Sequence, residues 1–295
     1  MYAGKNPVLA MDDIHGRPLS TIVGMGVFDG ECNVNVARDY VVNVVNARDP
    51  KTNQLLHPEL RHYYTEWLGF FWWRPEKNFK MDDHITIWNN GNLDVLTENV
   101  FIKIVADLEC RPFPEEKSPW DVLLIPNCLF KNVQNPERPK FVLVFRIHHG
   151  LADGVSVLQV FMQYVFDNVS DKLVTSTVVQ ENPYQKLVYQ LGGMVQLPYQ
   201  FLKQGFTAMD VNSWHLPANQ LSRKIYKAWS PRIGIDVIKE IKMRHNVGFT
   251  AVLIALISGA IRKMMVKCDV AVPKKVHAIL PLPWPNHPSK FCNHW

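Results

Sequence analysis

The sequence lacks the features that mark several classes of protein. Its five cysteines are odd in number and widely spaced, and no Cys-x-x-Cys occurs. A disulfide scaffold and a zinc ribbon are therefore disfavoured, and a reducing, intracellular compartment is expected. A phosphate-binding P-loop, a Gly-x-Ser-x-Gly nucleophile elbow and a His-Glu-x-x-His helix are also absent from the chain. These absences argue against nucleotide-triphosphate, serine-hydrolase and zinc-peptidase chemistry.

Charge of one sign is not concentrated anywhere. The 32 basic and 27 acidic residues give a net charge of +5, and runs of Lys and Arg are missing. Nucleic-acid binding requires a concentrated basic patch, so no nucleic-acid partner is expected. The mild excess suits a weak attraction to anionic cofactors or lipid headgroups.

Long apolar runs are also scarce. The N-terminus has no apolar segment of signal-peptide length, and the longest apolar stretch, 248–261, is too short to cross a bilayer. It predicts a buried helix, so neither a signal peptide nor a transmembrane span is expected. Residues 68–73 are unusually aromatic. Core packing at a helix end is the preferred interpretation of this segment, and insertion into a membrane interface is the alternative.

What the chain does contain is enough apolar sequence for a large core, with 295 residues of which 47% are hydrophobic. Periodicity and β-branched content predict the following elements. Strands are expected at 21–28, 120–125, 141–149 and 276–280, and helices at 34–45, from 155 onward, at 235–243 and at 250–265. Strands mixed with helices indicate the α/β class.

The clearest strand, 141–149, leads into the most informative motif. Side chains alternate along a strand, so one face is apolar and ends at His149, whereas the other carries Arg146 and His148. The adjacent histidines therefore point in opposite directions. No metal site is expected from the pair, although His148 together with Asp153 remains a possible combination.

The position of His149 suits proton transfer. A neutral imidazole at the end of an apolar face can take a proton from a hydroxyl group. Asp153 would fix the loop, either by pairing with an arginine or by capping the helix that follows. Gly154 would permit tight packing where a side chain would block the site. Taken singly, each residue also has an ordinary structural interpretation, such as a satisfied polar histidine at a strand end.

Residues 148–154, His-His-Gly-Leu-Ala-Asp-Gly, resemble the signature of the CoA-dependent acyltransferase superfamily. Further blocks resemble the wax ester synthase/diacylglycerol acyltransferase family within it. These blocks are 17–21, 27–30, 79–85, 118–125, 249–256 and 276–282. The resemblance covers nearly the whole chain, but Thr250-Ala251 stands where that family commonly has Asn-Asp.

The resemblance implies an α/β, chloramphenicol-acetyltransferase-like fold of two lobes with a substrate tunnel between them. Residues 1–213 would form the N-terminal lobe that carries the histidine motif. Residues 214–295 would form the start of the C-terminal lobe, which is expected to be truncated because family chains continue further.

The resemblance also implies an activity. Family members transfer a fatty acyl group from acyl-CoA to the hydroxyl of diacylglycerol or a long-chain alcohol, in triacylglycerol or wax ester synthesis. By carry-over, His149 is the general base, His148 supports it, and Asp153 is more structural than proton-carrying. Acyl-CoA is a co-substrate, and no permanently bound cofactor is implied. The expected location is a peripheral membrane or lipid-droplet surface, at the endoplasmic reticulum or plasma membrane.

Three alternatives remain open. The chain could be a catalytically impaired lipid-binding fragment, because the second lobe is expected to be incomplete. It could be an amide-forming condensation-type domain, which the blocks at 17–21 and 79–85 disfavour. A metal-dependent hydrolase ranks last because the adjacent histidines diverge.

Overall fold

The computed structural model describes residues 12–30, 33–68, 70–88, 95–130, 138–164, 183–207, 224–230, 233–278 and 290–293, with positions 216, 217, 220 and 222. The chain divides into two compact units. One comprises Met1–Thr177, Ile225–Trp229 and Pro283–Trp295, and the other comprises Val178–Lys224 and Ser230–Leu282. The lobe boundary expected between residues 213 and 214 lies outside the described residues.

A mixed five-stranded sheet forms the centre of the first unit. Its order is β1 (Thr21–Asp29), β7 (Lys140–His148), β6 (Trp120–Leu129) and β4 (Ile85–Ile87), and the short β5 (Leu96–Thr97) also pairs with β6. β7 runs antiparallel to both its neighbours, whereas β4 and β5 run parallel to β6. The strands predicted at 21–28, 120–125 and 141–149 are confirmed.

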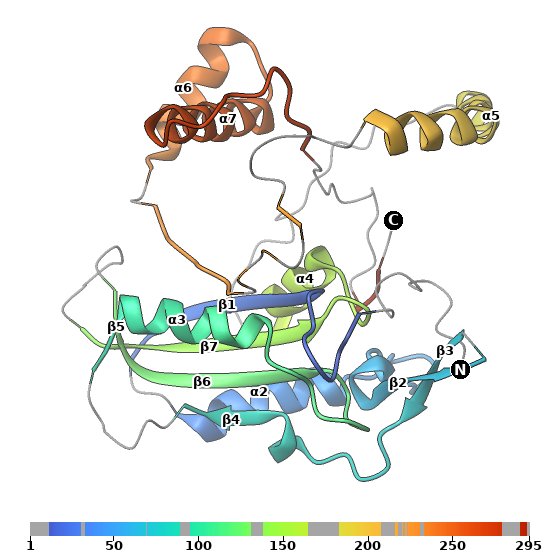
Figure 1. The fold of residues 1–295 in the computed structure, drawn as a ribbon. Coiled ribbons are helices and arrows are strands. Elements are labelled where there is room, and N and C mark those ends of the chain that lie inside the picture. Colours follow the sequence, from blue (N-terminus) through green and yellow to red (C-terminus); the bar gives the residue numbers. More distant parts are fainter. Residues whose placement is uncertain are drawn as a thin grey trace. The chain divides into compact units, whose positions relative to one another are not determined.

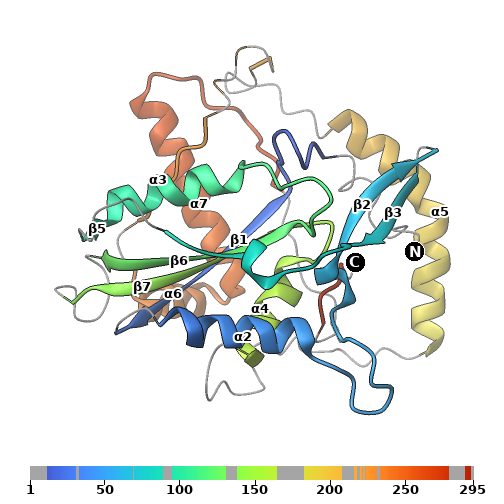
Figure 2. The ribbon, with the colours of Figure 1, turned by 90° about the horizontal axis from the view of Figure 1, so that it is seen from below.

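Helices cover both faces of this sheet, as Figures 1 and 2 show. One face packs against α2 (Val34–Asn46) and α4 (Gly154–Tyr164), and the other packs against α3 (Glu98–Glu109). Alternate residues of β7 supply the two cores. Leu143, Phe145 and Ile147 face the first pair of helices, and Val142 and Val144 face α3. The predicted alternation of β7 is therefore confirmed, and burial on both faces explains its nearly continuous apolar sequence.

The aromatic segment 68–73 was predicted wrongly as a helix end. It belongs to an antiparallel hairpin of β2 (His62–Trp67) and β3 (Phe70–Pro75). Aromatic residues favour strands because they pack across neighbouring strands, and the rings of Tyr64 and Trp73 stack with centroids 3.9 Å apart. At the turn, Trp67 and Leu68 are 61% and 74% exposed, and Leu68 adopts the left-handed conformation with φ 52°.

A buried polar cluster joins β3 to the start of β6, with the short helices η1 (Pro58–Arg61) and η2 (Met81–Asp83) beside it. Glu76 is buried and accepts hydrogen bonds from Ser118 N at 3.0 Å and Lys117 Nζ at 2.8 Å. His84 lies 3.3 Å from the same carboxylate and its ring stacks on Trp120. The two sequence blocks at 79–85 and 118–125 therefore meet in one structural network.

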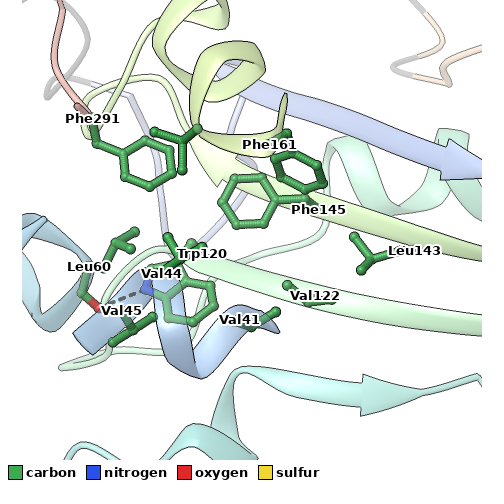
Figure 3. A pocket seen from close by; sticks show the side chains of 11 residues that line it. Val41, Val44, Val45, Leu60, Trp120, Val122, Leu143, Phe145, Phe161 and Phe291 are labelled. Carbon is green, nitrogen blue, oxygen red and sulfur yellow. Dashed lines mark hydrogen bonds between the residues drawn. The ribbon is translucent and has the colours of Figure 1, made fainter. Parts of the chain in front are cut away.

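A small apolar cavity of about 30 Å³ lies in the core between the sheet, α2 and α4 (Figure 3). Side chains from α2, β6, β7 and α4 line it, together with Phe291, which is distant in the sequence. Trp120 Nε1 donates to the carbonyl oxygen of Leu60 at 2.7 Å beside it. An apolar space of this size stays dry and is far too small for a fatty acyl chain.

The second unit contains α5 (Pro183–Thr207), α6 (Ile235–His245) and α7 (Phe249–Lys267). The helices predicted at 235–243 and 250–265 are confirmed, and α6 ends at Asn246 in the left-handed conformation before α7 begins. The strand predicted at 276–280 does not form at residues 276–278, where no described strand pairs with them, and residues 279–280 lie outside the described residues.

The prediction of a buried helix at 248–261 is wrong for the described structure. Within α7 only Val252 and Met265 are buried. Among the residues that the structure describes, α7 is the one helix whose length and composition would suffice to cross a membrane. Core helices of soluble proteins share that composition, so these two properties alone do not assign a span.

Candidate active site

His148 ends β7 as a buried, fully engaged residue. Its Nε2 lies 3.3 Å from Asp12 Oδ2, and the backbone N–H of Gly150 donates to its Nδ1 at 3.2 Å. Because Nδ1 is the acceptor, Nε2 carries the proton and donates to Asp12. Burial lowers the pKa of His148 and Asp12 only partly opposes this effect, so the ring is neutral at neutral pH.

Asp12 is a partner that the sequence did not reveal. Its carboxylate accepts hydrogen bonds from the N–H groups of Leu19 at 2.7 Å and Ser20 at 2.6 Å as well as from His148. Burial alone would raise the pKa of Asp12, but these hydrogen bonds outweigh it and hold the pKa below its usual value. The carboxylate thus ties the segment before β1 to the histidine motif.

His149 is half-buried and lies just beyond the end of β7. Its backbone N–H donates to Ser20 O at 2.7 Å, and its Nδ1 lies 3.1 Å from Asn293 Oδ1. The side-chain amide of Asn293 also donates to His149 O at 2.8 Å. The two histidines therefore contact different partners, Asp12 and Asn293.

Both ring nitrogens of His148 are engaged by Asp12 and Gly150, which removes the combination of His148 with Asp153. Within the described ranges, no group of three or more His, Cys, Asp or Glu side chains is placed to hold a metal ion.

Asp153 caps α4. Its Oδ1 accepts a hydrogen bond from Ser156 N at 2.8 Å, and Ser156 Oγ donates to Asp153 O at 3.0 Å. The structure thus shows helix capping, one of the two roles predicted for Asp153. Arg146 pairs with Asp121, on the opposite face of the sheet from α4.

Arg146 lies in the core beneath α3 and is only 1% exposed. Its guanidinium forms an ion pair with Asp121 and donates to the carbonyl oxygens of Leu108 at 3.0 Å and Arg111 at 2.5 Å. It also lies 4.0 Å above the ring of Phe113. The predicted structural role of Arg146 thus has a physical basis in a buried charge whose three guanidinium nitrogens all donate hydrogen bonds.

Among the described residues, tight packing is found at Gly150 and not at Gly154. A Cβ built at Gly154 meets no atom of the described residues within 4 Å. A Cβ at Gly150 would lie 2.4 Å from Tyr64 Oη and 3.0 Å from His148 Nδ1. Since Tyr64 is held by its stack on Trp73, the hairpin packs tightly against the histidine motif at this glycine.

Substituting the two glycines separates these roles. Gly150→Ala is expected to lower the free energy of unfolding by roughly 1–3 kcal/mol, because it overpacks a filled contact. Gly154→Ala, the matched control in the first turn of α4, is expected to be neutral or to stabilise by about 0.5–1 kcal/mol. Urea unfolding followed by circular dichroism measures both, and coincident midpoints would contradict the assignment of Gly150.

The segment 290–293 contacts the histidine motif, which no sequence pattern indicated. Phe291 is 1% exposed and its ring contacts those of His57 and Phe145. The carbonyl oxygen of Cys292 accepts from Asp153 N at 3.0 Å and from Ser156 Oγ at 2.9 Å. These contacts place Asn293 directly against His149.

Comparison with known proteins shows the fold. No protein-family model matches the chain, and no curated protein matches it significantly. The wax ester synthase/diacylglycerol acyltransferase from Marinobacter aquaeolei VT8 has a similar structure, with a TM-score of 0.51 and 14% identity over 93% of this chain and 62% of that one. A tallysomycin biosynthesis protein matches with a TM-score of 0.37 and 16% identity, over 61% of this chain and 42% of that one.

This chain therefore has an α/β fold similar to that of the Marinobacter enzyme, the chloramphenicol-acetyltransferase-like fold that the motif resemblance implies. It spans 62% of the length of the Marinobacter enzyme. At 14% identity the likeness establishes the fold and leaves the reaction to be argued from the site.

Proposed function

We propose that this chain transfers a fatty acyl group from acyl-CoA to the hydroxyl of diacylglycerol or of a long-chain alcohol. The observation that carries the proposal is the placement of His149. Its half-buried imidazole lies at the end of the apolar face of β7, and Asn293 holds its Nδ1. The fold shared with an enzyme named for this activity supports the same conclusion.

The reaction requires one proton carrier. As the acceptor oxygen attacks the thioester carbonyl carbon, Nε2 of His149 takes the hydroxyl proton, and a tetrahedral oxyanion forms. Collapse of this intermediate breaks the C–S bond, and the imidazolium returns the proton to the CoA thiolate. The products are an ester and free CoA, and the imidazole is regenerated without an acyl-enzyme or a permanently bound cofactor.

The other motif residues act through position. His148 and Asp12 fix the loop that follows β7, and Asp153 fixes the start of α4. The apolar core beneath His149, which includes Ile147 and Leu151, limits the access of water to that side of the loop. Fewer water molecules near the thioester mean less hydrolysis in competition with transfer.

Lipid acceptors reside in membranes and lipid droplets. The protein would therefore act at a membrane or lipid-droplet surface, at the endoplasmic reticulum or plasma membrane. The β2–β3 hairpin supports this part of the proposal, because its turn exposes Trp67 and Leu68 while its stem packs against the histidine motif through Tyr64 and Gly150. Aromatic and aliphatic side chains of this kind partition into the headgroup region.

Turnover of a defined substrate pair tests the proposal. Palmitoyl-CoA offered with hexadecanol or with dipalmitoylglycerol is expected to yield palmityl palmitate or tripalmitin, together with one CoA for each ester formed. Chromatography resolves the esters and a thiol reagent measures CoA. Retention of palmitoyl-CoA without release of CoA would identify a lipid-binding protein, and product formation only with an amine acceptor would identify a condensation-type enzyme. Either result would overturn the proposal.

A further inference from the structure

We propose that Asn293 is a positioning residue that holds His149 in the tautomer with its proton on Nδ1, so that the lone pair of the neutral ring lies on Nε2. This inference rests on the proposed function, because it explains how the general base is prepared. It concerns an asparagine 144 positions along the chain from the histidine.

The backbone fixes which way the amide of Asn293 points. Two carbonyl oxygens, those of His149 and Gly150, lie 2.8 Å and 3.4 Å from Nδ2 of Asn293. Carbonyl oxygens only accept hydrogen bonds, so the atom that faces them must be the amide nitrogen. The amide oxygen is then the atom that lies 3.1 Å from Nδ1 of His149.

The orientation of the amide fixes the proton of the imidazole. An amide oxygen is an acceptor without a proton, so a hydrogen bond to it requires that Nδ1 be the donor. In a neutral imidazole one nitrogen donates and the other accepts. With the proton on Nδ1, the lone pair is on Nε2, the nitrogen that must take the proton of the acceptor hydroxyl. A ring in the other tautomer would present an N–H at that position and could not act as a base there.

A buried side chain and several backbone hydrogen bonds anchor the segment that carries Asn293. The Phe291 side chain is buried in the core, and the Phe291 N–H donates to Nδ1 of His57 at 3.3 Å. Burial, aided by the charge of Lys290, lowers the pKa of His57 to about 4, so its ring remains an acceptor at neutral pH. Cys292 O accepts two further hydrogen bonds from the start of α4. Asn293 therefore has little freedom to leave His149.

Two substitutions of Asn293 distinguish a positioning role from a purely structural one. Asn293→Ala removes both the oxygen that faces Nδ1 and the donor that faces the carbonyls. Asn293→Asp keeps an oxygen toward Nδ1 and removes only the donor. A purely structural role predicts similar behaviour of the two variants, since both lose the hydrogen bonds to the backbone. A positioning role predicts that the aspartate variant retains the Nδ1–H tautomer and the alanine variant loses it.

The tautomer is measured directly by NMR of the full chain labelled with ¹⁵N, using two-bond correlations from the ring protons to both imidazole nitrogens. His149→Gln identifies the signals, and a pH at which they no longer shift ensures a neutral ring. Wild type and Asn293→Asp are expected to show a protonated Nδ1, and Asn293→Ala is expected to shift toward a protonated Nε2. A wild-type ring protonated on Nε2 would overturn the inference whether or not the variants fold.

Kinetics provide the second measurement. Asn293→Ala is expected to lower kcat about 10- to 100-fold with KM for palmitoyl-CoA little changed, because the base is misoriented while the substrate sites remain. If kcat of Asn293→Ala is unchanged while substitution of His149 abolishes turnover, this inference is overturned and the proposed function stands. Turnover that is also indifferent to His149 would overturn the proposed function itself.

Discussion

Replacement of His149 by alanine is expected to reduce ester formation by roughly 10²- to 10⁴-fold, the contribution usual for a positioned general base. The side chain is half-buried, and the change removes its interaction with Asn293 Oδ1. The loss should therefore fall on turnover, measured as CoA release from palmitoyl-CoA with hexadecanol, and not on the folded state. The thermal midpoint should stay close to that of the wild type.

His148→Ala is the matched comparison, because the two histidines are adjacent and only one is proposed to meet substrate. His148 is fully buried and joined to Asp12 and to the Gly150 N–H. Its removal leaves a buried carboxylate with one fewer donor, so the thermal midpoint should fall. Near-normal CoA release from the His149 variant, in a preparation of unchanged stability, would refute its role as the base.

Replacement of Arg146 by alanine is expected to produce the largest loss of stability in the first unit. Removing one partner of a buried ion pair costs about 3–5 kcal/mol, a large part of the roughly 5–15 kcal/mol that stabilises a folded protein. The variant would leave the Asp121 carboxylate and the carbonyl oxygens of Leu108 and Arg111 without their common donor. Much of the protein is expected to become insoluble or to unfold at low urea concentration.

Arg111→Ala provides the control on the same side of the sheet. Its guanidinium is 43% exposed and pairs with Asp107 one helical turn earlier, an arrangement worth about 0.3–0.5 kcal/mol. Its backbone carbonyl, which accepts from Arg146, is unaffected by the change. The urea midpoint of unfolding should therefore be much lower for Arg146→Ala than for Arg111→Ala. Similar midpoints would show that the Arg146–Asp121 pair is dispensable for folding.

The sequence predicts part of the local structure of the first unit, namely the elements that carry a clear periodic signal of their own. β7 alternates between two cores and α2 repeats its apolar residues at helical spacing, so both were found within a few residues of their ends. The histidine motif is also local, since His148, His149 and Asp153 follow one another around a single strand-to-helix corner. A pattern within seven residues suffices to locate it.

Predictions failed where the answer depended on distant residues. Asp12 and Asn293 lie 136 and 144 positions from the histidines they contact, and no spacing rule connects them. Gly150, and not Gly154, is the tightly packed glycine because Tyr64 of the β2–β3 hairpin presses on it. The burial of α7 was misjudged for the same reason: composition describes a helix as apolar but does not say what covers it.

The separation of His149 from Asn293 also sets an order of events during protein synthesis. At roughly 5–20 residues per second, the ribosome adds Asn293 on the order of 10 s after His149, since 144 positions separate them. In that interval the nascent strand can already pair with β1 and β6, while the imidazole still lacks its amide partner. The segment 290–293 thus reaches this corner well after the sheet beneath it has had time to form.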